Sequence, residues 1–321
     1  MTVLVWVLTQ NQANFDVVMN LPSGIHFFER GWLSANNTLL LDNEQAILID
    51  TGYHSHASQT LALIQSTLGR RSLTQILNTH LHSDHCGGNA LLQAAFPDAR
   101  TLAPPGLAPS IREWDPVALT YTPTGQACPR FKLSDVLRDG EHFQVSGRRW
   151  EVHASPGHDP HSVVLFCPSE RILISADALW ENGFGVVFPE IEGDEAFHEV
   201  ANTLDLIEKL QPSLILPGHG APFRDLDGAL TRARSKLAKY VNAPEQHAVY
   251  AAKVLLKFKL LEFQTIAFDE FVTWASRASY LHLLHQRYAS ELTFADWIHD
   301  LCNGMQRSGA CVLQENTISN A

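Results

Sequence analysis

Short apolar runs alternate with helical periodicity over the first two thirds of the chain. Apolar runs of four to eight residues with polar or Gly/Pro boundaries are typical of strands, and apolar residues at every third or fourth position predict amphipathic helices. The pattern predicts strands over residues 3–8, 25–28, 37–42, 46–50, 75–78, 149–154, 162–167, 171–175 and 213–217, and helices over 55–68, 88–95 and 194–210. We expect a layered α/β fold of two packed sheets with helices outside.

Two regions depart from this alternation. Residues 101–147 are rich in Pro and Gly and weakly periodic, and we interpret them as an insertion or lid over a site. After Arg224 helical periodicity dominates, with predicted helices over 228–241, 244–262, 268–289 (broken near Ser279) and 293–307, then a short strand over 309–313. We therefore predict two domains, a catalytic domain over 1–225 and a mostly helical domain over 226–321.

The densest candidate chemistry is the segment His80-Leu81-His82-Ser83-Asp84-His85, which follows the strand predicted to end at residue 78. In an extended backbone, His80 and His82 point to the same side, because side chains alternate along a strand. Asp84 and His85 then turn past the strand end. Imidazole and carboxylate together suit zinc and neighbouring divalent metals.

Three further residues that can bind a metal stand at similar places. His158 follows the strand at 149–154, Asp177 the strand at 171–175, and His219 the strand at 213–217. Each alone is more often a turn residue. Together with the His-rich segment they indicate one site built from several strand ends.

These motifs resemble the metallo-β-lactamase-fold hydrolases. The His-x-His-x-Asp-His signature is present as His80, His82, Asp84 and His85, an early strand-turn signature matches residues 46–52, and the later ligands match His158, Asp177 and His219. The resemblance covers residues 20 to 225. It implies an αββα sandwich of two mixed β-sheets flanked by helices, with a small, mostly helical C-terminal domain.

The resemblance also implies a binuclear metal centre. His80, His82 and His158 would hold one ion and Asp84, His85 and His219 the other, with Asp177 bridging both and with catalytic roles for Asp84 and Asp177. Two divalent ions, Zn²⁺ first and Mn²⁺ or Fe²⁺ as alternatives, would share the attacking hydroxide. His82 stands where the oxygen-reducing di-iron relatives have Glu, which favours hydrolysis. Asp50 and Asp159 are candidates for orienting the imidazoles.

Three residues are candidates for substrate contacts. His161 lies three residues beyond His158, and Trp180 and Phe184 follow Asp177 together with Phe188. In a cleft wall the aromatic residues would favour an apolar acyl or ring substrate, and in a core they would only pack.

Charge and composition limit the kinds of molecule that the protein is expected to bind. Residues 1–221 carry 12 Lys and Arg against 24 Asp and Glu, a net charge of −12, whereas residues 222–321 carry 11 against 10. An acidic catalytic half repels a polyanion, so a small-molecule substrate is expected and nucleic acid is disfavoured. The five cysteines have no paired spacing, and neither a signal peptide nor a membrane span is evident. We expect a cytoplasmic protein.

The C-terminal order of several short helices and a small strand loosely resembles the winged-helix-type tail of some family members. Its near-zero net charge argues against DNA binding, and a structural or homodimer-forming role is the alternative. Three functions remain: a hydrolase of a small ester, thioester, lactone or lactam; a phosphodiesterase or ribonuclease of the same fold; and a non-catalytic metal-binding regulatory protein. The complete ligand set favours the first.

Overall fold

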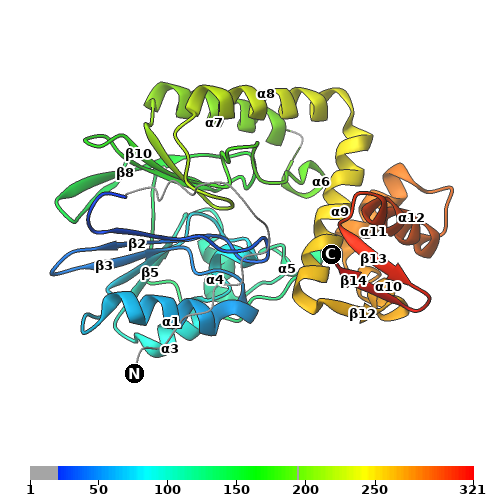
Figure 1. The fold of residues 1–321 in the computed structure, drawn as a ribbon, viewed down its shortest axis with the longest axis horizontal. Helices are drawn as coiled ribbons and strands as arrows, with labels where there is room; N and C mark the ends of the chain where they lie inside the picture. Colours follow the sequence, from blue (N-terminus) through cyan, green and yellow to red (C-terminus); the bar gives the residue numbers. More distant parts are fainter. Residues whose placement is uncertain (1–20, 194) are drawn as a thin grey trace, which may run out of the picture.

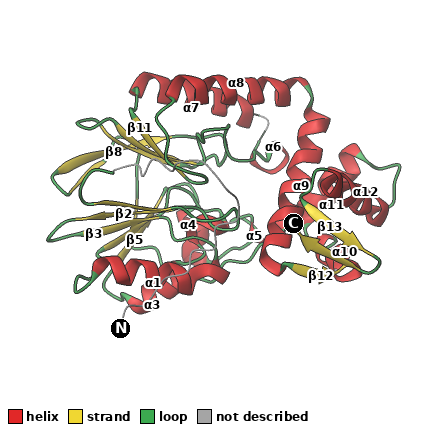
Figure 2. Ribbon diagram, viewed as in Figure 1, coloured by secondary structure: helices red, strands yellow, loops and turns green. Residues whose placement is uncertain are grey.

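Two β-sheets face each other and carry helices on both outer sides (Figure 1, Figure 2). The structure is a computed structural model that describes residues 21–193 and 195–321. The strand predicted over 3–8 lies outside these residues, as does the first residue of the helix predicted over 194–210. The predicted αββα sandwich with a helical C-terminal region is confirmed.

The first sheet has the strand order β1-β2-β3-β4-β5-β6. Its antiparallel half joins β1, β2 and β3, and from β3 onward the pairs are parallel. The strands are Ile25–Phe28, Asn37–Leu41, Ala46–Ile49, Gln75–Leu77, Arg100–Ala103 and Asp135–Val136.

The second sheet has the order β11-β10-β9-β8-β7. The edge strand β11 runs parallel to β10, and the other pairs are antiparallel. In chain order from β7 to β11, the strands are His142–Val145, Arg148–Ala154, Val163–Cys167, Ile172–Ala176 and Leu214–Pro217.

The central strands are continuously apolar because both of their faces are buried. On β3, Ile47 and Ile49 point into the space between the sheets, where Trp150 and Leu165 of the second sheet meet them. Leu48 points outward and packs under the helices of the first sheet. The pattern of the sequence therefore predicts strands, and burial on both sides explains why these strands do not alternate between apolar and polar residues.

Helices cover the outer faces of both sheets. On the first sheet lie α1 (Ala57–Leu68), preceded by a 3-10 turn at His54–His56, and α3 (Asn89–Ala95). On the second sheet lie α7 (Ala196–Leu210) and α8 (Leu226–Asn242). Shorter helices are α2 (Ser83–Cys86), α4 (Ala108–Glu113), α5 (Tyr121–Thr124) and α6 (Pro189–Glu192).

The interpretation of residues 101–147 as an insertion was wrong at both ends. β5 and β6 complete the first sheet and β7 begins the second, so this segment carries the chain from one sheet to the other. Its strands are two to four residues long, which is too short for a periodic signal. Between them, α4 and α5 pack around Leu81 and Cys86, beside the His-rich segment.

The C-terminal elements pack in a core built around α9 that includes Leu256, Phe271 and Ile298, and Val186 and Phe188 of the sandwich contribute to the same core. They are α9 (Pro244–Phe263), α10 (Phe268–Ala275), α11 (Ser279–Tyr288) and α12 (Phe294–Arg307), with a small sheet of β12 (Thr265–Ala267), β14 (Thr317–Asn320) and β13 (Cys311–Gln314). The predicted break near Ser279 separates α10 from α11. Two of the three small strands were not predicted.

The helix α8 lies on the sandwich, because Leu226, Leu230 and Leu237 pack with α7 and the second sheet. The predicted domain boundary at 225/226 stays a prediction. Because α8 packs on the sandwich, the core of the C-terminal elements begins with α9. In the described part of the chain, no helix combines the length and apolarity needed to cross a lipid bilayer.

Candidate metal centre

The seven predicted ligands converge at one edge of the sandwich. The His-rich segment follows β4, while His158, Asp177 and His219 follow β8, β10 and β11. Strand ends from two sheets therefore place these side chains together, although they are up to 139 positions apart between His80 and His219.

The side chains form two clusters with one carboxylate between them. Ligand atoms of His80, His82 and His158 lie within 4.8 Å of one another, and those of Asp84, His85 and His219 form a second such group. In the first cluster His82 Nδ1 is 2.9 Å from His158 Nε2. In the second, His219 Nε2 is 3.1 Å from Asp84 Oδ2. These are the two groups that the resemblance implied, and a third such group of His80, His85 and Asp177 joins them.

Asp177 lies between the two clusters. Its Oδ1 lies 3.3 Å from His85 Nε2, and its Oδ2 lies 3.4 Å from His158 Nε2 and 3.8 Å from His219 Nε2. Trp180 Nε1 donates a hydrogen bond of 3.3 Å to Oδ1. A Cβ atom at Gly218 would collide with Asp177, so glycine makes room for the carboxylate. The carboxylate of Asp177 is therefore within reach of ligand atoms from both clusters.

The site fits divalent metal ions. His80 Nε2 is buried and has no hydrogen-bond partner among the described residues, and His85 Nε2 is buried beside the carboxylates of Asp177 and Asp84. A buried polar atom without a partner is costly, and a metal ion bound by the nitrogen lone pair removes that cost. The mixed set of imidazoles and carboxylates suits zinc, manganese or iron.

The electrostatics keep His80, His158 and Asp177 in forms that bind cations. Burial lowers the pKa of His80 well below its usual value and that of His158 to about 4. Burial by itself would raise the pKa of Asp177, but His85 and His219 outweigh it and hold that pKa well below the usual range. Although burial would lower the pKa of His85, nearby carboxylates instead raise it well above its usual value, so a metal ion bound at His85 would have to displace a proton.

Hydrogen bonds from the Nδ1 atoms of His85 and His158 orient these two imidazoles. His85 Nδ1 donates to Asp50 Oδ2 over 2.8 Å, and Asp50 also accepts from the backbone and hydroxyl of Thr79. Asp50 has a φ of 58°, an uncommon backbone conformation for a residue with a side chain. His158 Nδ1 donates to the carbonyl of Val186 over 2.6 Å. The other candidate, Asp159, is more distant, with its Oδ2 at 4.0 Å from His82 Nε2.

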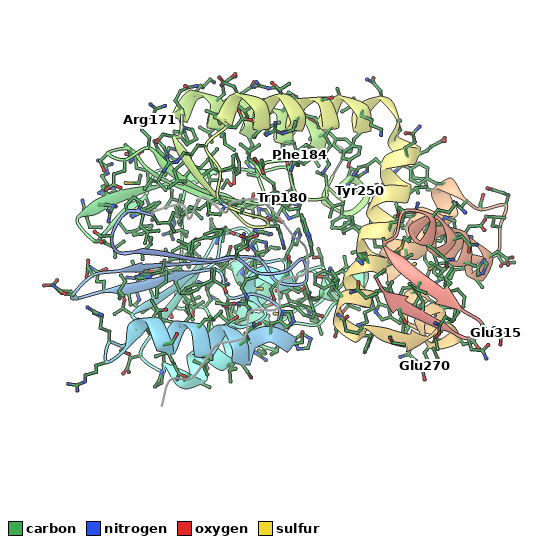
Figure 3. The ribbon with its side chains drawn as sticks, viewed as in Figure 1. Arg171, Trp180, Phe184, Tyr250, Glu270 and Glu315 are labelled. Carbon is green, nitrogen blue, oxygen red and sulfur yellow. The ribbon has the colours of Figure 1, made fainter. Side chains whose placement is uncertain are left out.

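The clusters open into a cavity of about 140 Å³ with two unlike sides. His82, Asp84, His158, Asp177 and His219 form the polar side. The opposite side is formed by Tyr250, Val254, Leu255 and Phe258 of α9. Trp180 and Tyr250, labelled in Figure 3, lie where the sandwich approaches α9.

Only one of the three predicted substrate-binding residues reaches this cavity. Trp180 lines it. The structure does not bring Phe184 there, because its ring is 1% exposed and packs in the core under α7 and α8. His161 is exposed and lies against Gly106 beside a different surface cavity.

Several cavity residues were missed by the sequence analysis. Trp32 is 59% exposed and stacks on His219, with ring centroids 5.3 Å apart and an interplanar angle of 7°. Nothing in the local pattern separates Trp32 from an ordinary loop residue. The α9 residues follow core-like periodicity, so their pattern predicts packing and not a cavity wall. The remaining missed residues are Thr120, Thr124, Gln126 and Val186.

Comparisons with known proteins agree with this arrangement. A family model described as the metallo-beta-lactamase superfamily matches residues 30–219. A hydroxyacylglutathione hydrolase of Stenotrophomonas maltophilia is 33% identical over 150 residues, 47% of this chain and 48% of that protein. An atrochrysone carboxyl ACP thioesterase of Aspergillus fumigatus is 27% identical over 201 residues, 62% of this chain and 40% of that protein. The chain spans about half the length of these curated relatives.

Solved structures share the fold. A metallo-beta-lactamase family protein of Thermus thermophilus superposes with a TM-score of 0.57 at 22% identity, over 94% of this chain and 100% of that one. A second protein, TTHA1623 in a di-iron-bound form, has a TM-score of 0.50 at 27% identity, over 65% of this chain and 98% of that one. The family model covers more than half of the chain, and the chain belongs to the metallo-beta-lactamase superfamily.

Proposed function

We propose that this protein is a binuclear metal-dependent hydrolase of a small acyl compound: an ester, thioester, lactone or lactam, with thioesters first. The observation that carries the proposal is the position of Asp177, whose carboxylate lies between the two clusters, 3.4 Å from His158 Nε2 and 3.3 Å from His85 Nε2. Its neighbours complete two ligand sets of the kind that divalent ions occupy.

His80, His82 and His158 would hold one ion, and Asp84, His85 and His219 the other, with Asp177 shared. Zinc is the first expectation, and manganese or iron would suit the same donors; the relative crystallised with two irons supports this range. Bound divalent ions lower the pKa of water and polarise a carbonyl oxygen.

The protein's own residues supply position and shape. Trp180 donates to Asp177 and thereby fixes the plane of the shared carboxylate. Asp50 holds His85 in one orientation and tautomer. The apolar side of α9 limits water in the cavity and offers a surface for the carbon skeleton of a substrate.

The relatives and the charge support an acyl substrate. One relative is named a hydroxyacylglutathione hydrolase and another an atrochrysone carboxyl ACP thioesterase. Residues 1–221 carry a net charge of −12, so a nucleic acid backbone would find few cations near the metal ligands. A small molecule remains the proposed partner.

A substrate panel tests the proposal. Metal-replete protein should hydrolyse at least one of a short thioester, an aryl ester and a lactone, and activity should vanish on chelation and return with added metal. His82→Ala should be inactive on the same compounds. Cleavage of single-stranded RNA without turnover of any acyl compound would favour the phosphodiesterase alternative, and metal binding without turnover of either kind would favour a regulatory protein.

A further inference from the structure

A second apolar space adjoins the cavity at the metal ligands. It measures about 380 Å³ and lies between α9 and the C-terminal end of α12. Trp32, Tyr250, Val254 and Phe258 line both spaces, so the two are neighbours along one face of α9. Leu261 and Met305 extend the apolar lining away from the ligands. We name this space the α9–α12 groove; α9 stands between the sandwich and the other C-terminal elements (Figure 1).

Two cations meet at α12 beside the groove. A Cβ atom built on Gly304 would lie 2.6 Å from Lys253 Nζ and 3.7 Å from Arg307 Nη2, so both cationic groups lie at this glycine. Within residues 21–193 and 195–321, neither Lys253 nor Arg307 forms an ion pair or a side-chain hydrogen bond.

A third cation beside the groove, Lys257, forms hydrogen bonds within the protein. Lys257 Nζ donates to the carbonyls of Ala310 and Ala321 and to Asn320 Oδ1, at 2.7, 3.0 and 2.6 Å. It ties α9 to the C-terminal strand β14. Lys257 therefore has a structural role, whereas Lys253 and Arg307 are available to a ligand.

We propose that the α9–α12 groove binds a linear apolar arm of the substrate whose far end carries an anionic group held by Lys253 and Arg307. The proposal rests on the proposed function, because it places the reacting end of the same molecule at the metal ligands. A lysine and an arginine side by side suit a carboxylate or a phosphate. The substrate class is therefore an anionic amphiphile with its acyl bond at one end.

Binding measured without turnover tests the groove. Titration calorimetry of the full chain would use decanoate and decyl phosphate below their critical micelle concentrations and 1-decanol below its solubility limit, with and without EDTA. We expect each anion to bind at least tenfold more tightly than the alcohol, and this preference to survive EDTA. From hexanoate to decanoate, affinity should rise about fourfold per methylene, which corresponds to ~0.8 kcal/mol. Equal binding of alcohol and anions, or binding of anions only while metal is present, would overturn the proposal.

Variants locate the two parts of the groove. Lys253→Ala combined with Arg307→Ala should remove the preference for anions and leave 1-decanol binding unchanged. Lys239→Ala, an exposed lysine of α8, is the matched control and should bind all three ligands as the parent does. Leu261→Glu should abolish the dependence on chain length, and an unchanged circular dichroism spectrum would show that it folds.

The two proposals can fail separately. Binding of decanoate by a protein that hydrolyses no acyl compound would support the groove and contradict the proposed hydrolase. Hydrolysis of short thioesters by a protein in which neither affinity nor KM depends on chain length would support the hydrolase and overturn the groove.

Discussion

The two sides of the cavity are built from different kinds of structure. The polar side comes from strand-end loops of the sandwich, where seven ligand candidates are held by hydrogen bonds such as those of Asp50. The opposite side comes from α9, whose residues are mostly apolar and pack like a core. The polar side determines which reaction the site can catalyse, and the α9 side determines which substrates fit in the cavity. The residues of the polar side can therefore be recognised from a sequence signature, whereas those of the α9 side cannot.

Asp177→Ala should have the largest effect on the polar side. It removes the carboxylate that faces both clusters, so metal affinity and kcat/KM should fall by more than the ~10–100-fold typical of losing an outer partner of a ligand. His161→Ala is the control, because His161 is exposed beside another cavity. Equal losses in the two variants would mean that His161 belongs to the site.

Asp50→Asn should weaken metal binding by about 10–100-fold, since His85 loses the carboxylate that fixes its orientation. Competition with a chromogenic chelator would measure this. Asp159→Asn is the matched change, and its effect should be smaller because Asp159 Oδ2 is 4.0 Å from His82 Nε2. A larger loss in Asp159→Asn would reverse the roles of the two carboxylates.

Glu262→Gln tests the junction between α9 and the sandwich. Glu262 accepts hydrogen bonds from Tyr53 of the sandwich at 3.1 Å and from Lys259 at 2.8 Å. Leaving Lys259 without its carboxylate should cost ~1–3 kcal/mol in the free energy of unfolding at pH 7. Urea titration of both proteins would measure the difference.

The same residue predicts a pH dependence. Burial would raise the pKa of Glu262, but its bonds to His54, Lys259 and Tyr53 outweigh burial and lower the pKa to about 2. A carboxylate with a lowered folded-state pKa stabilises the fold above its unfolded pKa, near 4.3, and that contribution is lost as the pH falls toward 2. Unfolding free energies should therefore fall more steeply with acid in the parent than in Glu262→Gln. Parallel curves would contradict this assignment.

Trp32→Ala should have the smallest effect. The ring stacks on His219 and lines both the cavity and the α9–α12 groove. Losing an aromatic contact worth ~0.5–1.5 kcal/mol should raise KM for apolar substrates by roughly 2- to 10-fold with little change in kcat. Val117→Ala, an equally exposed residue elsewhere, should leave both parameters unchanged. A fall in kcat alone would instead place Trp32 in the chemistry.

Much of the fold follows from the sequence because the central strands are apolar on both faces. β3 and β9 are buried along their whole length and stand out as uninterrupted apolar runs. β5, β6 and β7 were missed, because their two to four residues carry too little pattern. The small strands β12 and β14 were missed for the same reason.

Some residues of the candidate site could likewise be predicted from the sequence, and others could not. His80 to His85 could be predicted because three imidazoles and a carboxylate within six residues are costly to bury unless they bind a ligand. Trp180 and Phe184 could not be told apart, since which aromatic ring enters a cavity depends on the path of the loop after Asp177. Val254 and Phe258 could not be separated from core residues, because a helix face that lines a cavity has the same periodicity as one that packs.

Metal stoichiometry tests the central claim most directly. Elemental analysis of protein reconstituted with zinc or manganese and freed of excess metal should approach two ions per chain. Asp177→Ala, measured alongside, should fall well below two, because its carboxylate faces both clusters. A parent value that stays near zero after reconstitution would contradict the binuclear site.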